Sequence, residues 1–385
     1  MLESFENRKI WTSAVFLYIA LWGVSIQMRG ALLSEIKATF SVSESLLGLV
    51  APAASVSFAL SALLSGMFAG KIFIERYILI GLGLTALATF LLGLAPTYLL
   101  FLILLIVVGL FSGIPGGLGR PFVGHLYPES RGRIFSLNEA FWAIGATIGP
   151  LFAILIMEVW GLWRHAYIFL GLFFFLVFIL MYRADPSEVS VREDPVSFDK
   201  VGEILKNPVI LCVLFGILFD VGVEGGVFTW LVYYLEQEGF SQFVARSSLS
   251  GFLAAYIPGR LLNSRISERF KHENLVAVYA GSVVLLLFSA FFLLSGYWVI
   301  LAVFVSGFFI SGIWPNLFTL GVETFPNYSG PINGLAMTFD PLGFSLIPPI
   351  MGFLADKFYI DLAMRFLLVP MSLVFLISLF IKVKI

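Results

Sequence analysis

The chain has 385 residues, of which 59% are hydrophobic and 12% are charged, and its mean hydropathy is +0.99. In soluble domains about a quarter of the residues are charged, and a soluble chain of this length needs polar surfaces that so few charges cannot cover. The composition therefore indicates a membrane protein and excludes a soluble enzyme. The net charge of −1 excludes a basic nucleic-acid-binding face.

Neither disulfide nor metal chemistry is expected. Cys212 is the single cysteine, so the chain cannot form an internal disulfide. His125, His165 and His272 lie far apart in the sequence and form no metal-ligand motif. The sequence also lacks a glycine-rich phosphate-binding motif, so we expect no cofactor.

Long runs with few or no charged residues predict twelve membrane-spanning helices, because one span needs about 20 mostly apolar residues. The runs 77–119 and 274–322 each hold two spans, divided at Ala95-Pro96-Thr97 and near Ser295-Gly296. The other eight predicted spans are 10–28, 45–70, 140–157, 165–182, 208–234, 246–263, 331–354 and 363–381.

A polar stretch separates these spans into two groups of six. Residues 183–206 hold ten charged side chains in 24 positions, together with Pro186 and Pro195, and are too polar for the bilayer. We therefore expect an all-α membrane protein with an N-terminal six-helix bundle at 1–182, a cytoplasmic linker at 183–207 and a C-terminal six-helix bundle at 208–385.

The basic residues predict the orientation. With both termini in the cytoplasm, only six of the 23 basic residues fall outside: Arg29, Lys37, Arg164, Arg246, Lys357 and Arg365. Basic residues collect on the cytoplasmic side of membrane proteins, so we expect a multi-pass protein of the cell membrane with both termini cytoplasmic. Glu3 and Glu6 interrupt the basic start that a signal peptide needs, so the first span is expected to stay uncleaved.

The two halves repeat each other at an offset of 198 residues. Five glycine and proline pairs coincide in order: Gly109 and Gly307, Pro128 and Pro326, Gly132 and Gly330, Gly145 and Gly343, and Pro150 and Pro348. Two parallel six-helix repeats around a cytoplasmic linker are typical of alternating-access transporters, which bind their solute near mid-membrane between the halves.

Three motifs carry a family resemblance: YPESRGR at 127–133, GATIGP at 145–150 and SRISERFK at 264–271. They resemble the loop between helices four and five, the helix-five motif GxxxGP and the GxxxDRxG gating loop of the major facilitator superfamily. In the gating loop this chain has Ser, Glu and Lys in place of Gly, Asp and Gly. The resemblance covers nearly the whole chain. It implies the twelve-helix major facilitator fold, with gating-loop residues Arg131, Arg133, Arg265, Glu268 and Arg269.

Further stretches are similar to the fucose-permease-like sugar transporters of that superfamily. They are RPFV at 120–123, GVE at 222–224 with Trp230, GRLL at 259–262, IWPNLF at 313–318 and PPIMG at 348–352. This similarity implies a sugar-like solute. Proton-coupled members of the subgroup carry acids in helices one and four, where this chain has Gly30 and Gly116 with Arg29 and Arg120 close by. An anionic solute is therefore the alternative.

Ionisable residues inside predicted spans are candidates for solute binding or ion coupling, because a charge at mid-bilayer costs at least a few kcal/mol. Asp220 and Glu224 share one face of the seventh span, Asp340 lies in the eleventh span and Glu139 in the fifth. Burial and like-charge neighbours favour a protonated carboxyl, which a proton carrier needs. The alternative is that some of these acids form structural ion pairs with an arginine.

Two arginines and several uncharged residues complete the candidates. Arg29 and Arg120 are suited to capture an anion or to form a moving ion pair. Alternatively, Arg29 reaches the outer interface and Arg120 stabilises helix packing. The candidates for binding the hydroxyl groups of a solute are Gln27, Asn138, Asn316 and Trp230.

The leading hypothesis is a secondary active transporter that moves a small polar, sugar-like solute by alternating access, with protons as the candidate coupling ion. Its alternatives are an organic-anion exchanger or efflux transporter that uses the arginines, and a receptor that binds without transport. A membrane enzyme is least favoured, because the sequence has no Ser/His/Asp or metal constellation. The expected partners are a small molecule and membrane lipids, without nucleic acid, and the chain is expected to be a monomer.

Overall fold

The computed structural model describes residues 2–68, 73–127, 131–184, 202, 204–325 and 329–384. All regular elements in these residues are helices, which confirms the predicted all-α class. The chain divides into two compact units, Met1–Val42 with Ala53–Pro195 and Ser43–Pro52 with Val196–Ile385. The division after Pro195 falls inside the predicted linker.

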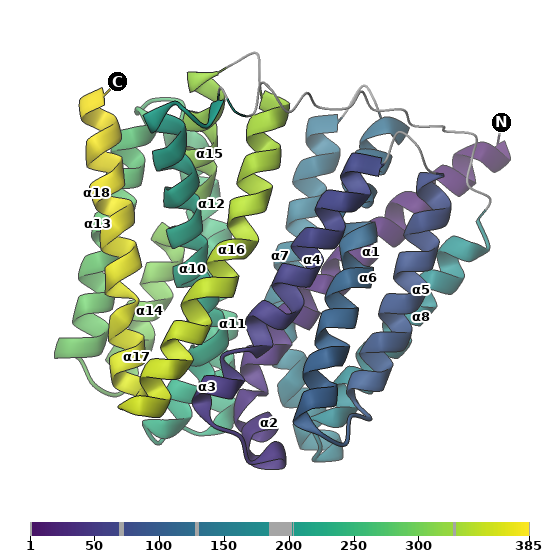
Figure 1. Cartoon of the computed structure of the whole chain (residues 1–385), viewed down its shortest axis with the longest axis horizontal. Coiled ribbons are helices and arrows are strands. Elements are labelled where there is room, and N and C mark those ends of the chain that lie inside the picture. Colours follow the sequence, from purple (N-terminus) through teal and green to yellow (C-terminus); the bar gives the residue numbers. More distant parts are fainter. Residues whose placement is uncertain are drawn as a thin grey trace. The chain divides into compact units, whose positions relative to one another are not determined.

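The first unit is a bundle of helices that run side by side (Figure 1). Within it α1 packs against α7 and α8, and α5 packs against α6 and α8. The break predicted at Ala95-Pro96-Thr97 separates α5 from α6, and the Thr97 side chain caps α6 by accepting from the Leu100 backbone at 3.3 Å. The helices are α1 (Leu2–Ala31), α2 (Leu33–Phe40), α4 (Val50–Phe68), α5 (Ile74–Leu92), α6 (Tyr98–Leu126), α7 (Arg131–Trp160) and α8 (Arg164–Tyr182).

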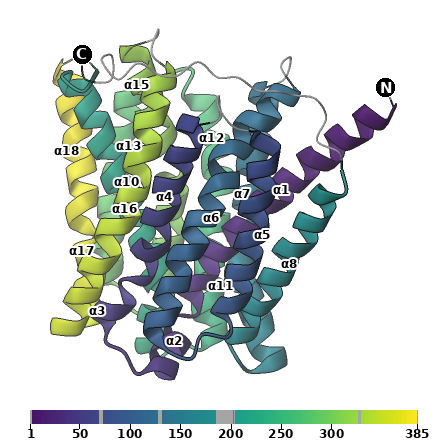
Figure 2. The same cartoon turned by 45° about the vertical axis from the view of Figure 1, so that its right-hand side comes forward.

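The second unit is also a helical bundle (Figure 2), in which α10 packs against α16 and α18, and α13 against α18. Asn207 caps α10, and Pro208 occupies its first turn, where the missing N–H is tolerated. The elements are α3 (Glu44–Leu47), α10 (Pro208–Gln237), α11 (Gln242–Ala254), α12 (Tyr256–Ile266), α13 (His272–Phe288), the π-helical η3 (Ser289–Leu293), α14 (Tyr297–Ile310), α15 (Ile313–Thr324), α16 (Ser329–Lys357), α17 (Ile360–Phe366) and α18 (Leu368–Lys384).

The short segment Ser43–Pro52 belongs to the second unit although it precedes most of the first. Tyr233 on α10 donates a hydrogen bond to the Glu44 carboxylate at 2.7 Å, and Ser45 donates to Asp356 on α16 at 2.5 Å. These two polar contacts and the packing of α3 on α16 attach the segment to this unit.

Eleven helical segments of the described residues are long and apolar enough to cross a membrane, and they coincide with eleven of the predicted spans. The eighth predicted span, 246–263, forms the two shorter helices α11 and α12, which meet at Ala255. Neither is long enough alone. Together they occupy the place of the eighth span, so the structure fits the predicted twelve-helix fold.

Glycines at equivalent positions bring equivalent helices together in both units. A Cβ added at Gly145 on α7 would overlap the carbonyl of Ala20 on α1, and one added at Gly343 on α16 would overlap the carbonyl of Leu218 on α10. Ala20 and Leu218 are themselves 198 positions apart. The repeat read from the sequence therefore extends to the helix contacts that the glycines make.

We predict that Gly343→Ala destabilises the protein, because the new methyl group would push α16 away from the α10 backbone. Overpacking of this kind costs about 1–3 kcal/mol. Gly334→Ala on the same helix is the matched control, since a Cβ there meets no atom within 4 Å. Thermal unfolding in detergent should show a lower midpoint for Gly343→Ala only. Equal midpoints for the two variants would contradict this packing.

Candidate functional site

Three acids and a tyrosine–arginine pair come together in the second unit. Asp220 and Glu224 lie on α10, Tyr256 and Arg260 on α12, and Asp340 on α16. The Tyr256 hydroxyl donates a hydrogen bond to Glu224 Oε1 at 2.9 Å. Asp340 lies within electrostatic range of both α10 acids, and Arg260 lies within range of Glu224. We call these five residues the acid cluster.

Helix packing explains why acids that are distant in sequence meet here. On α10, added Cβ atoms at Gly222 and Gly225 would collide with the side chains of Ile347 and Phe344 on α16. The two helices can therefore approach closely only because these positions lack side chains. This approach brings Asp340 on α16 near the two α10 acids.

Asp220 is the least satisfied member of the acid cluster. Its side chain is 0% exposed, and neither carboxyl oxygen has a hydrogen-bond partner among the described residues. A buried, ionised carboxylate without partners costs several kcal/mol, so such a group is generally protonated or completed by a ligand. In a transport site, a protonated Asp220 can carry a proton, and a ligand that completes it can be the solute.

Sequence reasoning placed the acids but missed Tyr256 and Arg260. The two residues are spaced i, i+4 and so lie on one face of α12. The Arg260 guanidinium carbon is 5.9 Å from the centroid of the Tyr256 ring. The sequence did contain a signal for this pair. Arg260 lies inside the eighth predicted span, in the GRLL stretch, and Tyr256 precedes it by four residues, the spacing that places two side chains on one helix face.

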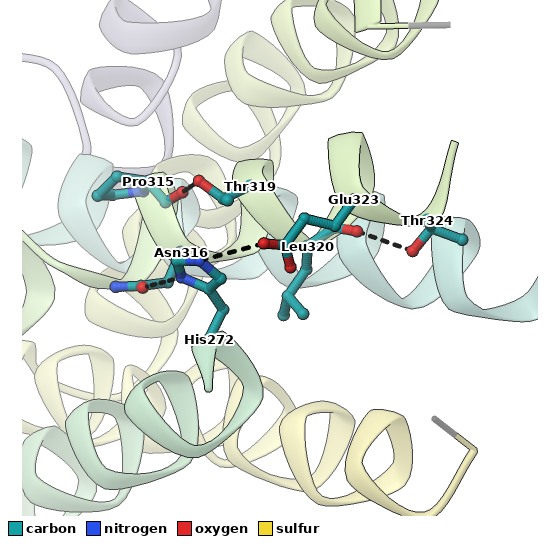
Figure 3. A network of polar contacts seen from close by, with 7 residues as sticks. All are labelled: His272, Pro315, Asn316, Thr319, Leu320, Glu323 and Thr324. Atoms are coloured by element: carbon teal, nitrogen blue, oxygen red, sulfur yellow. Dashed lines mark hydrogen bonds and ion pairs between the residues drawn. The ribbon is translucent and has the colours of Figure 1, made fainter. Parts of the chain in front are cut away.

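Asn316 lies in a different part of the second unit, in a polar network whose contacts with His272 and Glu323 are shown in Figure 3. Its side-chain nitrogen donates to Asn263 Oδ1 at 2.7 Å and to the Gly312 carbonyl at 2.6 Å. Its Oδ1 therefore accepts from His272 Nδ1, at 2.6 Å, so Nδ1 carries the proton. The other ring nitrogen of His272 faces the Glu323 carboxylate at 3.6 Å. The network joins α12, α13 and α15.

The arginine candidates lie in the first unit. Arg29 on α1 is 7% exposed, donates to Ser25 Oγ at 3.2 Å, and lies with its guanidinium carbon 5.5 Å from the centroid of the Trp22 ring. It therefore stays inside the bundle instead of reaching the surface. Arg120 on α6 is half-buried.

The remaining candidates are dispersed. Trp230 is fully buried and donates its indole N–H to the Pro348 carbonyl at 3.0 Å. Gln27 and Asn138 are buried in the first unit. In the gating loop Arg265, Glu268 and Arg269 are exposed, whereas the side chains of Arg131, Arg133 and Glu139 lie outside the described residues. In the described part of the chain, no three His, Cys, Asp or Glu residues are arranged to hold a metal ion.

Comparisons with known proteins agree with this architecture. The Glucose/galactose transporter of Brucella abortus biovar 1 (strain 9-941) is 25% identical over 378 residues, which cover 94% of this chain and 91% of the relative. The fold matches that of a bacterial homologue of the human lysosomal transporter Spinster in its inward-facing, occupied conformation, with a TM-score of 0.84, 16% identity and coverage of 98% and 96% of the two chains. It also matches the E. coli fucose:proton symporter FucP, with a TM-score of 0.65, 20% identity and coverage of 97% and 99%.

The family assignment rests on a match along most of the chain. Residues 11–346 match the family model described as Major Facilitator Superfamily. The relatives and the family are transporters and not enzymes. The chain therefore belongs to the major facilitator superfamily and is a multi-pass membrane transporter of a small molecule.

Proposed function

We propose that this protein is a secondary transporter that moves a small, sugar-like polar solute across the cell membrane together with protons. In the proposed cycle the two units give alternating access to the solute, both termini lie in the cytoplasm, and the protein acts as a monomer. The support for a sugar-like solute is the Brucella relative, named a glucose/galactose transporter, and the similarity of fold to a fucose:proton symporter.

Asp220 carries the coupled proton in this proposal. Its carboxyl group is fully buried and has no hydrogen-bond partner among the described residues, so protonation is the direct way to remove the cost of its charge. Two further acids, Glu224 and Asp340, lie within electrostatic range, with the guanidinium of Arg260 as the nearby positive charge. Adding or removing a proton on Asp220 therefore changes the net charge of the acid cluster. In this proposal that change alters how strongly the neighbouring Glu224 binds the solute.

Glu224 and Tyr256 bind the solute in the same proposal. A carboxylate accepts several hydrogen bonds, so Glu224 can accept from a solute hydroxyl as well as from Tyr256. The tyrosine ring adds an apolar face of the kind that sugar rings contact. The side chain of Asn316, in contrast, is occupied by its neighbours, and we assign it to holding α12, α13 and α15 together.

We predict that Asp220→Asn uncouples transport from protons. The amide keeps the size of the carboxyl group but carries no exchangeable charge. In proteoliposomes the variant should still exchange labelled galactose for unlabelled galactose, but should no longer accumulate it when the outside is made acidic. Glu238→Gln, at an exposed position at the end of α10, should accumulate galactose as the wild type does. Unchanged accumulation by Asp220→Asn would refute the assignment.

Tyr256→Phe should weaken solute binding and keep the coupling. The variant removes the hydrogen bond by which Tyr256 holds Glu224 in position for the solute. Such a bond to a charged group is worth about 1.5–3 kcal/mol, so misplacing Glu224 should lower solute affinity by about tenfold or more. We expect a higher KM for galactose with uptake still driven by the pH gradient. Tyr297→Phe, at an exposed tyrosine on α14, is the control. A wild-type KM for Tyr256→Phe would show that the hydroxyl takes no part.

Asn316→Leu should lower thermal stability, because it leaves His272 Nδ1 without its buried acceptor and removes one donor each from the Gly312 carbonyl and from Asn263, which keeps its bond from Tyr279. Unsatisfied buried polar groups cost about 1–3 kcal/mol each. Thr319→Val, one turn along α15, removes only a bond to the Pro315 carbonyl of the same helix and should change little. A loss of galactose affinity at wild-type stability would instead indicate that Asn316 contacts the solute.

A further inference from the structure

Arg29 is a charged group that the described residues do not neutralise. It lies near the end of α1, 7% exposed, and forms no ion pair with any described residue. Within the described part of the chain its side chain donates one hydrogen bond, to the hydroxyl of Ser25, and its buried Nε atom has no partner. A guanidinium stays charged at every working pH, and an uncompensated charge inside a membrane costs at least a few kcal/mol.

Other arginines near helix ends in this protein are satisfied differently. Arg164, in the same unit, donates to the carbonyls of Gly93 and Ala95 at the end of α5, at 3.3 Å and 2.5 Å. Arg365 in the second unit donates to the Phe291 carbonyl at 3.0 Å. Backbone carbonyls at helix ends are the usual partners of arginines that serve packing. Arg29 has no such carbonyl, so a packing role leaves its buried Nε unexplained.

Tyr167 on α8 provides a second unsatisfied group at the same place. It lies within electrostatic range of Arg29, is fully buried, and its hydroxyl has no hydrogen-bond partner among the described residues. Phe101 and Trp163 fix its ring edge-on, with centroids 5.9 Å and 5.8 Å away. Aromatic packing therefore sets the orientation of the Tyr167 ring, while its hydroxyl group has no hydrogen-bond partner among the described residues.

The Arg29 guanidinium and the Tyr167 hydroxyl both lack a negatively charged hydrogen-bond acceptor among the described residues. The guanidinium offers N–H donors, and the Tyr167 hydroxyl offers an O–H donor, but neither meets a charged acceptor. Nε and the neighbouring terminal nitrogen present two parallel N–H bonds, the arrangement that binds both oxygens of a carboxylate or two oxygens of a phosphate. The missing partner is thus an anion with at least two oxygens.

We propose that Arg29 and Tyr167, with Ser25, form a binding site for a small oxyanion. The oxyanion is either the carboxylate of the transported solute, which would then be a sugar acid or a similar hydroxy acid, or a free inorganic anion such as phosphate. The first source presupposes the proposed transport function, whereas the site itself does not.

Thermal unfolding of the purified full chain distinguishes the two sources. The probes are galacturonate, galactose and inorganic phosphate at equal ionic strength set with chloride. Galacturonate and galactose differ in having a carboxylate or a hydroxymethyl group at one carbon, so the pair isolates the charge. We expect galacturonate or phosphate to raise the midpoint in a saturable way by several degrees, beyond any effect of galactose. A shift with galacturonate alone would indicate that the site takes the carboxylate of a sugar acid, and a shift with phosphate alone that it takes a free inorganic anion. No shift with either would overturn the proposal.

Variants then locate the site. Arg29→Met should abolish the anion-dependent shift, and Arg29→Lys should weaken it about tenfold or more, because lysine keeps the charge but not the paired donors. The control Arg76→Met, at an exposed position on α5 of the same unit, should leave it unchanged. If Arg29→Met does not fold, Tyr167→Phe keeps the ring packing and carries the test. A wild-type shift in Tyr167→Phe or in Arg29→Lys would contradict the site as described.

The same measurements separate this site from the proposed transport function. Asp220→Asn should lose proton-driven galactose uptake and keep the anion-dependent shift, since the two sites lie in different units. A wild-type protein that binds the anion but transports no galactose would overturn the proposed solute and leave the oxyanion site standing.

Discussion

A charge in the hydrocarbon layer of a membrane must be paired, neutralised by a proton or completed by a ligand, because the layer itself offers no polar partner. In the described residues most ionisable side chains avoid this constraint by lying at helix ends or in loops. Those that remain inside include the acid cluster of the second unit, and Arg29 and Arg120 of the first. In the acid cluster and at Arg29, polar atoms have no hydrogen-bond partner among the described residues: the two carboxyl oxygens of Asp220, and Nε of Arg29 with the hydroxyl of Tyr167.

Packing determines where these groups meet. In the second unit Gly222 and Gly225 let α10 approach α16, which brings Asp340 near Asp220 and Glu224. The eighth span is divided at Ala255, and α12 starts with Tyr256, whose hydroxyl reaches Glu224. In the first unit the aromatic side chains of Phe101 and Trp163 fix Tyr167 near Arg29. The same apolar contacts that hold each bundle together therefore hold the candidate functional groups in place.

Much of the fold could be predicted from the sequence, because a membrane allows few structures. Long apolar runs with few or no charged residues located eleven spans directly, and the Pro96 and Gly296 breaks fell between helices as expected. The division of the eighth span at Ala255 fits Pro258, which has no N–H to bond the Ala254 carbonyl, but the prediction of one continuous span did not use this signal. The repeat was visible because glycines needed for close helix contacts, such as Gly145 and Gly343, recur at one offset.

The candidate sites were only partly predictable. An acid such as Asp220 is conspicuous in an apolar span, whereas Tyr167 is one aromatic residue among many, and its unsatisfied hydroxyl appears only in three dimensions. Asn316 is conspicuous too, but its partners His272 and Asn263 come from other helices, and no spacing along the chain connects them. Sequence patterns reveal which groups are costly to bury; the structure is needed to show which of them have partners.

Simultaneous measurement of solute and proton movement tests the central claim most directly. Wild-type protein in proteoliposomes without an imposed gradient would receive galactose outside, with a pH-sensitive dye reporting the external medium. Proton-coupled uptake by Asp220 predicts that the medium becomes more alkaline as galactose enters, and that Asp220→Asn removes this change. Galactose entry into wild-type vesicles without any pH change would contradict the account.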